Sequence, residues 1–356
     1  MAMDYGIFLA PFADSWKIVK RAETLGYRRA WFYDTQLLNA ELFVSMAAAA
    51  VQTSTIRLAT GVLIPSNRIA PVTASALASL NALAPGRIDF GISTGFTARR
   101  TLGLGPVKLG DLEEYVRVVR GLLARETLEW TFEGQKRKIR FLNPEVGAIN
   151  LTTRSPARRG DGPAGAPARR QARRGPRARD RQRRPRRRGH RRHAGRLARS
   201  RPRSRTVCTR RPPSAAASSA RARPADSPRA RAQAGPTATV ALHSLVEREA
   251  FGDLGRPLPP EFHPLLERYR QIYRGYEPAD ARYLSNHRGH LMFLRPEEHE
   301  VCTAELIRAT TFTGPRDELQ ERIRALGAAG FNHLGIMIRH GHPEMLEEWA
   351  ELLNGV

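Results

Sequence analysis

Residues with reactive or hydrogen-bonding groups gather directly after predicted strands. Asp34 follows a predicted strand at residues 30–33 and offers a carboxylate that could move a proton; the alternative is an Asp that caps a helix or a turn. Further hydroxyl, glycine and guanidinium groups lie at the ends of two later strands or follow them, and these residues are Thr60, Gly61, Val62, Ser93, Thr94, Gly95, Arg99 and Arg100. Hydroxyls and backbone N–H groups there could bind a ligand, and the arginines either approach a phosphate or face solvent.

Alternating strands and helices would position these residues. The predicted strands are residues 5–9, 30–33, 56–64 and 88–93, and the predicted helices are residues 15–25, 41–52, 71–83 and 109–124. Residues 129–141 predict a hairpin that turns at Glu133 and Gly134. The tail predicts helices at residues 261–274, 316–326 and 343–353 and a strand at residues 333–338. This alternation predicts an α/β fold with a parallel sheet, which is either a barrel or a doubly wound sheet.

The charge of the chain is concentrated in one segment. Residues 154–236 contain 28 arginines, no lysine and three acidic residues, so they carry the whole formal charge of +25. The rest of the chain has equal numbers of basic and acidic residues, as in an ordinary enzyme. With 356 residues the chain can form one large domain. We therefore divide it into residues 1–153, the Arg-rich segment 154–236 and residues 237–356.

The Arg-rich segment lacks the side chains that build a core. Its only large aliphatic residues are Leu197 and Val207, and it has no Ile, Phe, Met, Tyr or Trp. Three interpretations stay open: a disordered linker, an arm that binds nucleic acid, and a coding stretch translated out of frame by a frameshift. Permitted codons read in the next frame from Arg154 give Asp-Pro-Leu-Pro-Val-Val-Ala-Met-Gly-Pro-Arg-Ala-Arg, the pattern of a strand and a turn. We favour the frameshift, and we expect no nucleic-acid partner because Lys and aromatic residues are absent.

The cysteines and histidines predict neither a disulfide framework nor a metal site. The chain has two cysteines, Cys208 and Cys302, and the first falls in the Arg-rich segment. His340 and His342 flank a glycine turn without an E-x-x-H partner, so we expect no metal. The chain has no run of 18 apolar residues and its N-terminus has no secretion-signal pattern, which predicts a cytoplasmic protein without membrane contact.

Several stretches resemble the luciferase-like monooxygenase family. They are Trp31 to Asp34, Gly61 to Pro71, Leu80 to Arg87, Ile88 to Gly95, Thr313 to Pro315 and Gly330 to Ile336. The resemblance covers roughly residues 4–150 and 304–338. It implies a TIM (β/α)8 barrel, in which about strands five to seven would come from the Arg-rich segment. Chemistry in a TIM barrel lies at the carboxyl ends of the strands.

The resemblance also implies roles for the residues after the strands. Asp34 would be the catalytic residue near the cofactor rings, although Thr35 stands where relatives carry His. At the end of the third strand relatives often have a non-proline cis peptide bond against the flavin. The implied cofactor-binding residues are Thr60, Gly61, Val62, Ser93, Thr94, Gly95 and Arg99.

The implied activity is two-electron oxidation or reduction of a small organic substrate. Either reduced FMN and O2 drive a monooxygenase reaction, which we favour, or a deazaflavin, coenzyme F420, transfers hydride. The partners are then reduced flavin and a small-molecule substrate, and a homodimer is compatible with the sequence. An Arg-rich nucleic-acid-binding protein is the alternative of another class. Because the Arg-rich segment would have to supply barrel strands, we expect the chain as written to be unstable and inactive.

Overall fold

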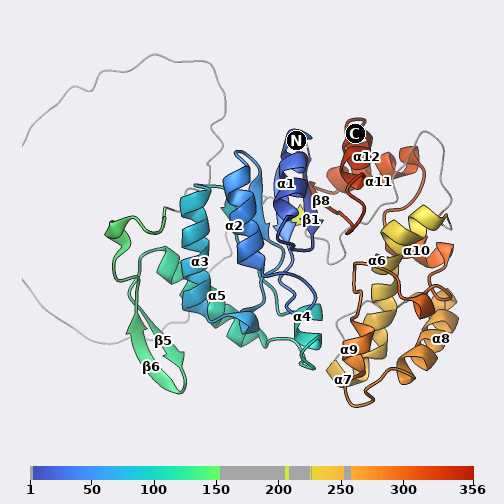
Figure 1. The fold of residues 1–356 in the computed structure, drawn as a ribbon, viewed down its shortest axis with the longest axis horizontal. Coiled ribbons are helices and arrows are strands. Elements are labelled where there is room, and N and C mark those ends of the chain that lie inside the picture. Colours follow the sequence, from blue (N-terminus) through green and yellow to red (C-terminus); the bar gives the residue numbers. More distant parts are fainter. Residues whose placement is uncertain (1–2, 153–204, 208–224, 226, 252–257) are drawn as a thin grey trace, which may run out of the picture. The chain divides into compact units, whose positions relative to one another are not determined.

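A parallel six-stranded sheet forms the centre of the fold in a computed structural model (Figure 1). The structure describes residues 3–152, 205–207, 225, 227–251 and 258–356. The strands are β1 (Asp4–Leu9), β2 (Arg29–Phe32), β3 (Arg57–Thr60), β4 (Ile88–Asp89), β7 (Arg205–Val207) and β8 (Phe331–Met337). Their order is β4-β3-β2-β1-β8-β7, so the first strand and the last strand along the chain are neighbours. In this register Ile7 lies beside both Ala30 and Ile336.

Helices that follow the strands cover one face of the sheet. They are α1 (Ser15–Thr24), α2 (Leu42–Gln52), α3 (Ala70–Leu83), α5 (Leu109–Leu123), α11 (Arg316–Ala328) and α12 (Met345–Leu353). Apolar residues at helical spacing, such as Val19 and Ala22 of α1, turn toward alternate strand residues such as Ile7 and Leu9. Leucines, isoleucines and alanines from both layers make one continuous core.

A second core forms among helices of the carboxyl-terminal part. These helices are α6 (Pro228–Val246), α7 (Arg248–Phe251), α8 (His263–Arg274), α9 (Arg282–Asn286) and α10 (Ala304–Thr310). Helix α6 packs against α8 and α10, and alanines on its buried face allow the close approach. A Cβ atom on Gly235 would lie 2.7 Å from Leu294 Cδ1, so the contact requires glycine. Helix α6 begins inside the Arg-rich range, so packed chain resumes before the boundary placed at Pro236.

Most predicted elements occur, with shorter strands at the candidate site. The predicted strand at residues 56–64 ends at Thr60, because the chain turns at Gly61 toward the short helix η1 (Pro65–Asn67). The predicted strand at residues 88–93 ends at Asp89, although a bridge joins Leu63 to Ile92. The predicted hairpin is present as β5 (Leu128–Phe132) and β6 (Gln135–Ile139).

The parallel sheet confirms the predicted α/β fold class. Within the described residues the sheet keeps two edges, β4 and β7, so the predicted (β/α)8 closure stays a prediction. The remaining described elements are α4 (Thr97–Arg100), η2 (Pro144–Val146), η3 (Pro260–Phe262) and η4 (Pro296–Glu298). Most of the Arg-rich segment, including Cys208, lies outside the described residues.

Candidate functional site

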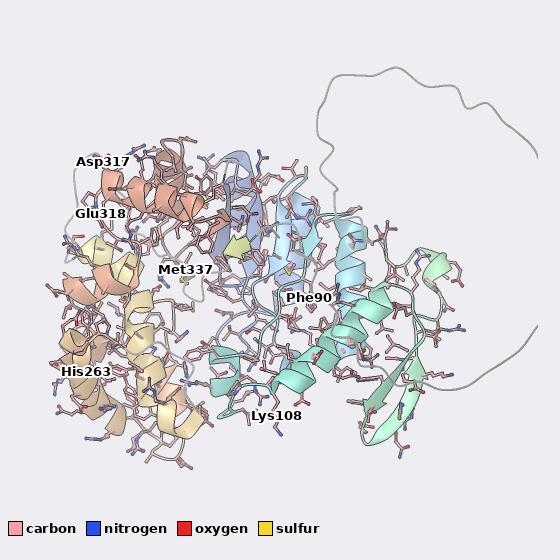
Figure 2. The ribbon with its side chains drawn as sticks, turned by 180° about the vertical axis from the view of Figure 1, so that it is seen from behind. Phe90, Lys108, His263, Asp317, Glu318 and Met337 are labelled. Carbon is pink, nitrogen blue, oxygen red and sulfur yellow. The ribbon has the colours of Figure 1, made fainter. Side chains whose placement is uncertain are left out.

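Aromatic side chains form a buried floor on the face of the sheet opposite the covering helices. Phe8 of β1 stacks on Trp31 of β2, with ring centroids 5.6 Å apart, and both pack with Ala59 and Met337. Met337 ends β8 (Figure 2), and Tyr33 lies against the same cluster. We call Phe8, Trp31, Tyr33, Ala59 and Met337 the aromatic floor. It is an apolar cluster near the carboxyl ends of β1, β2, β3 and β8, and Leu291 packs against it.

Glycine is required where β3 leaves the aromatic floor. A Cβ atom on Gly61 would lie 2.7 Å from Trp31 Cβ and 3.1 Å from Phe8 Cε1. The peptide bond between Gly61 and Val62 is cis, as the family resemblance implied. A bare stretch of backbone therefore borders the floor at this strand end.

Asp34 is held in a buried ion pair. Its carboxylate accepts hydrogen bonds from Arg68 Nη1 at 2.9 Å and from the backbone N–H of Ile64 at 2.9 Å. Arg68 also pairs with Glu41, and its carbonyl accepts a hydrogen bond from Tyr115. Burial lowers the pKa of Arg68, but the carboxylates of Asp34 and Glu41 outweigh burial and raise the pKa overall. Asp34 thus fixes the loop that follows β3.

Thr60 and the pair Ser93 and Thr94 differ in the freedom of their hydroxyls. The Thr60 hydroxyl makes both of its hydrogen bonds to Gly91. It donates to the Gly91 carbonyl at 2.6 Å and accepts from the Gly91 N–H at 2.9 Å. The backbone N–H of Ser93 donates to the carbonyl of Leu63, which continues the pairing of β3 with β4. The hydroxyls of Ser93 and Thr94 have no hydrogen-bond partner among the described residues, so both can bind a ligand.

The two neighbouring arginines have different surroundings. Arg99 donates from Nε to the carbonyl of Gly105 at 2.8 Å, and its Nη atoms have no partner in the described part of the chain. Gly95 adopts a φ of +83°, and a Cβ atom there would lie 2.5 Å from Arg99 Cγ. Arg100 is buried in an ion pair with Glu247. Arg99 is therefore the half-buried arginine of the two, whereas Arg100 is buried in its ion pair.

A buried histidine network that the sequence analysis missed reaches the same strand end. Thr97 Oγ1 lies 2.9 Å from His290 Nε2, and His290 Nδ1 lies 3.4 Å from His243 Nδ1. His243 Nε2 lies 2.5 Å from Glu298 Oε1, and Arg295 donates to the same carboxylate. These residues are far apart in the chain and match no spacing motif, so no sequence signal could have united them.

Arg339 is a second buried group at the carboxyl ends of the strands. It follows β8, donates to the carbonyl of Gln233 and the hydroxyl of Thr237, and is 1% exposed. Its Nη1 atom has no partner among the described residues. Burial, partly offset by Tyr33, lowers the pKa of Arg339 to about 10. The guanidinium adds positive potential near the aromatic floor.

A search of the described residues for metal and membrane features found neither. None of their His, Cys, Asp and Glu side chains form a group of three or more that could hold a metal ion. None of their helices is both long enough and apolar enough to cross a bilayer.

Comparison with known proteins assigns the family. The described residues define an α/β protein whose candidate site lies at the carboxyl ends of a parallel sheet. The family model for luciferase-like monooxygenases matches residues 3–333, so the chain belongs to that family. This match confirms the resemblance seen in the sequence.

Individual relatives are similar over part of their length. A 5,10-methylenetetrahydromethanopterin reductase of Methanolobus tindarius is 33% identical over 129 residues, which are 35% of this chain and 39% of the relative. A limonene 1,2-monooxygenase of Rhodococcus erythropolis is 32% identical over 144 residues, 35% of this chain and 37% of the relative. The chain therefore matches less than two thirds of these relatives' own length.

A solved structure shares the fold. The coenzyme F420 dependent tetrahydromethanopterin reductase from Methanopyrus kandleri aligns with a TM-score of 0.50 at 16% identity. The alignment covers 100% of this chain and 99% of that protein.

Proposed function

We propose that this protein is a flavin- or deazaflavin-dependent oxidoreductase whose cofactor ring lies on the aromatic floor. The observation that carries the proposal is an apolar aromatic cluster together with free polar groups beyond the carboxyl ends of β3 and β4. Planar cofactors with a polar edge and a phosphate need such a combination. We also propose that the sheet belongs to a TIM barrel, because β4-β3-β2-β1-β8-β7 is the order of consecutive barrel strands.

The residues present fit such a cofactor. The backbone at Gly61 can approach a planar ring closely, since glycine has no side chain. The free hydroxyls of Ser93 and Thr94 can bind the polar edge or the ribityl chain. Arg99 can bind the phosphate through its free Nη atoms.

The other two predicted residues take supporting roles in this proposal. Asp34 positions the loop after β3 through Arg68 and Ile64, which makes it a positioning residue rather than a group that contacts the ring. Thr60 anchors β4 through Gly91, which leaves only its backbone for the cofactor.

When bound, the cofactor supplies two-electron transfer, and the protein orients a small organic substrate against it. FMN with O2 is our first candidate, in agreement with the family description and the limonene 1,2-monooxygenase relative. Coenzyme F420 with hydride transfer is the second, because a 5,10-methylenetetrahydromethanopterin reductase is among the relatives. The aromatic floor excludes water from one side of the ring in both cases.

Cofactor titration tests the proposal. FMN and coenzyme F420 are titrated separately into the full chain, followed by fluorescence, with riboflavin as a phosphate-free control. A second protein, the frame-restored chain, carries residues 154–224 translated in the next frame. We expect saturable binding of one of the two cofactors to the frame-restored chain.

Comparing the full chain with the frame-restored chain distinguishes a wrong cofactor assignment from a loss of binding caused by the Arg-rich segment. Binding to the full chain would support the function and contradict the expected inactivity. Binding to the frame-restored chain alone would support the function and attribute the loss to the Arg-rich segment. If neither protein binds either cofactor, the proposed function is wrong.

A further inference from the structure

The histidine network has a consistent arrangement of hydrogens in which His243 and His290 each carry one hydrogen. Burial raises the pKa of Glu298, but hydrogen bonds from His243 and Arg295 outweigh burial and lower the pKa to about 2, so Glu298 is a carboxylate. A carboxylate only accepts, so His243 Nε2 carries a hydrogen and the Nδ1 of the neutral ring accepts. His290 then donates from Nδ1 to His243 and accepts at Nε2 from the Thr97 hydroxyl. Every donor in the chain points toward Glu298.

Thr97 is the end of the chain that a ligand can reach. It is half-buried, whereas His290, His243 and Glu298 are buried. Thr97 begins α4, two residues after Gly95 and three after Thr94 along the chain. A buried carboxylate is therefore connected by hydrogen bonds to the place where the cofactor is proposed to bind.

We propose that Thr97, His290, His243 and Glu298 form a proton relay that accepts a proton released at the carboxyl end of β4. The released proton binds Thr97 Oγ1 while the Thr97 hydroxyl proton passes to His290 Nε2. The His290 Nδ1 proton passes to His243 Nδ1. One proton enters and each N–H or O–H bond that breaks is replaced by one that forms, with no electron transferred. The charge ends as a His243 imidazolium beside the Glu298 carboxylate.

The charges around the network favour this direction. Burial, followed by the neighbouring His287 and His243 and by Arg295 and Arg339, lowers the pKa of His290 well below its ordinary value. His290 is therefore neutral at neutral pH and able to pass a proton on. The Glu298 carboxylate hydrogen-bonds His243 directly and compensates a charge there. The proton thus comes to rest at the deeper ring.

A separate network already provides the structural connection between these elements. Arg100 of α4 pairs with Glu247 at the end of α6, and Glu247 also accepts from Asn286 and from His287 Nε2. This second set of bonds joins α4, α6 and α9 without using Thr97 or His290. The connection among α4, α6 and α9 therefore does not depend on the hydrogen bond between Thr97 and His290 alone.

Nitrogen NMR of the full chain with ¹⁵N-labelled histidine tests the relay without any cofactor. We expect His290 in the Nδ1–H form and His243 in the Nε2–H form. Thr97→Val should shift the His290 Nε2 resonance, while His263→Gln, a change of an exposed histidine on α8 (Figure 2), should leave both rings unchanged. A His290 that carries its hydrogen on Nε2 would overturn the proposal.

Kinetics with FMN test the transfer itself, and this arm rests on the proposed function. Dithionite-reduced FMN, on whichever of the full chain and the frame-restored chain binds it, is reoxidised by ferricyanide, so that FMNH2 and two ferricyanide ions give FMN, two ferrocyanide ions and two protons. We expect Thr97→Val to slow this reaction about 100-fold and to remove its fall at acid pH, because positioned proton transfer contributes that much. Thr97→Ser keeps the hydroxyl and should retain the rate. Bound FMN with an unchanged rate and pH profile in Thr97→Val would refute the relay, whereas failure of FMN to bind would refute the proposed cofactor and leave the NMR result to decide.

Discussion

Arg100 and Glu247 form an ion pair in which the side chains are 1% and 0% exposed. Arg100 Nη1 lies 3.0 Å from Glu247 Oε2, and 147 residues of chain separate the two partners. The guanidinium also lies over the rings of Phe96 and Phe251, at 4.3 Å and 5.5 Å from their centroids. The parts of the chain before and after the Arg-rich segment therefore share one buried charge pair.

Glu247→Gln should strongly destabilise the fold, because it leaves the Arg100 guanidinium buried without its counter-charge. We expect the free energy of unfolding to fall by about 3–5 kcal/mol in urea titrations. Asp14→Ala is the control, since it removes an exposed ion pair with Lys17 and should change little. Equal effects of the two substitutions would contradict the role assigned to the buried pair.

Gly61→Ala should weaken cofactor binding. The new Cβ atom would press on Trp31 and displace either the ring or the strand end, at a cost of about 1–3 kcal/mol. A cost of that size in the cofactor-binding state corresponds to an affinity for FMN about 10- to 100-fold lower by fluorescence titration. Gly110→Ala in α5 meets no atom within 4 Å and should leave the affinity unchanged. An unchanged affinity for FMN in Gly61→Ala would show that Gly61 does not contact the cofactor.

Arg99→Ala should remove the preference for a phosphorylated flavin. Hydrogen bonds to charged groups contribute about 1.5–3 kcal/mol, so FMN should lose about 10- to 100-fold in affinity while riboflavin loses little. Arg28→Ala is the matched control, because Arg28 is exposed and precedes β2 at the opposite end of the sheet. If Arg99→Ala weakens riboflavin and FMN equally, Arg99 does not bind the phosphate.

His333 should make the fold sensitive to acid. Its Nε2 atom accepts from Trp31 Nε1 at 3.2 Å, and burial, with help from Arg29, lowers the pKa of His333 to about 4. Between pH 6.5 and pH 4 His333 is protonated in the unfolded chain but stays neutral in the folded chain. The contribution of His333 to the free energy of unfolding is therefore fully present above pH 6.5. It falls as the pH drops through this window, by up to about 3 kcal/mol.

His333→Gln tests this window by urea unfolding at pH 7 and pH 5. The difference in unfolding free energy between the two pH values should be smaller in His333→Gln than in the unsubstituted chain. His263→Gln should reproduce the unsubstituted difference, because His263 is exposed. An identical pH dependence in all three proteins would show that His333 titrates normally.

Much of the sheet could be predicted because its signals are local. The alternation in residues 5–9 and the helical spacing in residues 15–25 identify β1 and α1 directly. Helix α6 could not be predicted over its first half, because arginines and an internal Pro236 conceal a face whose burial depends on α8 and α10. Tertiary packing here overrides the helix propensity of the segment.

The candidate site also has one part that local sequence signals predict and one part that depends on distant contacts. Positions such as Gly61 and Ser93 follow predicted strands, so the sequence placed them at one sheet edge. The sequence could not show that Arg99 is free while Arg100 is buried, since that difference depends on Glu247, far along the chain. The histidine relay depends on contacts between α4, α6 and residues near α9, which no spacing in the sequence encodes.

Because β1 pairs with β8, this part of the sheet can form only after nearly the whole chain has been synthesised. The ribosome releases residues 4–9 early, but their partner residues 331–337 leave it almost last. Throughout elongation β1 therefore presents an open edge with unpaired backbone groups, and β2 to β4 can protect only its other side. The nascent chain passes through a long interval in which intermolecular pairing at this edge competes with completion of the sheet.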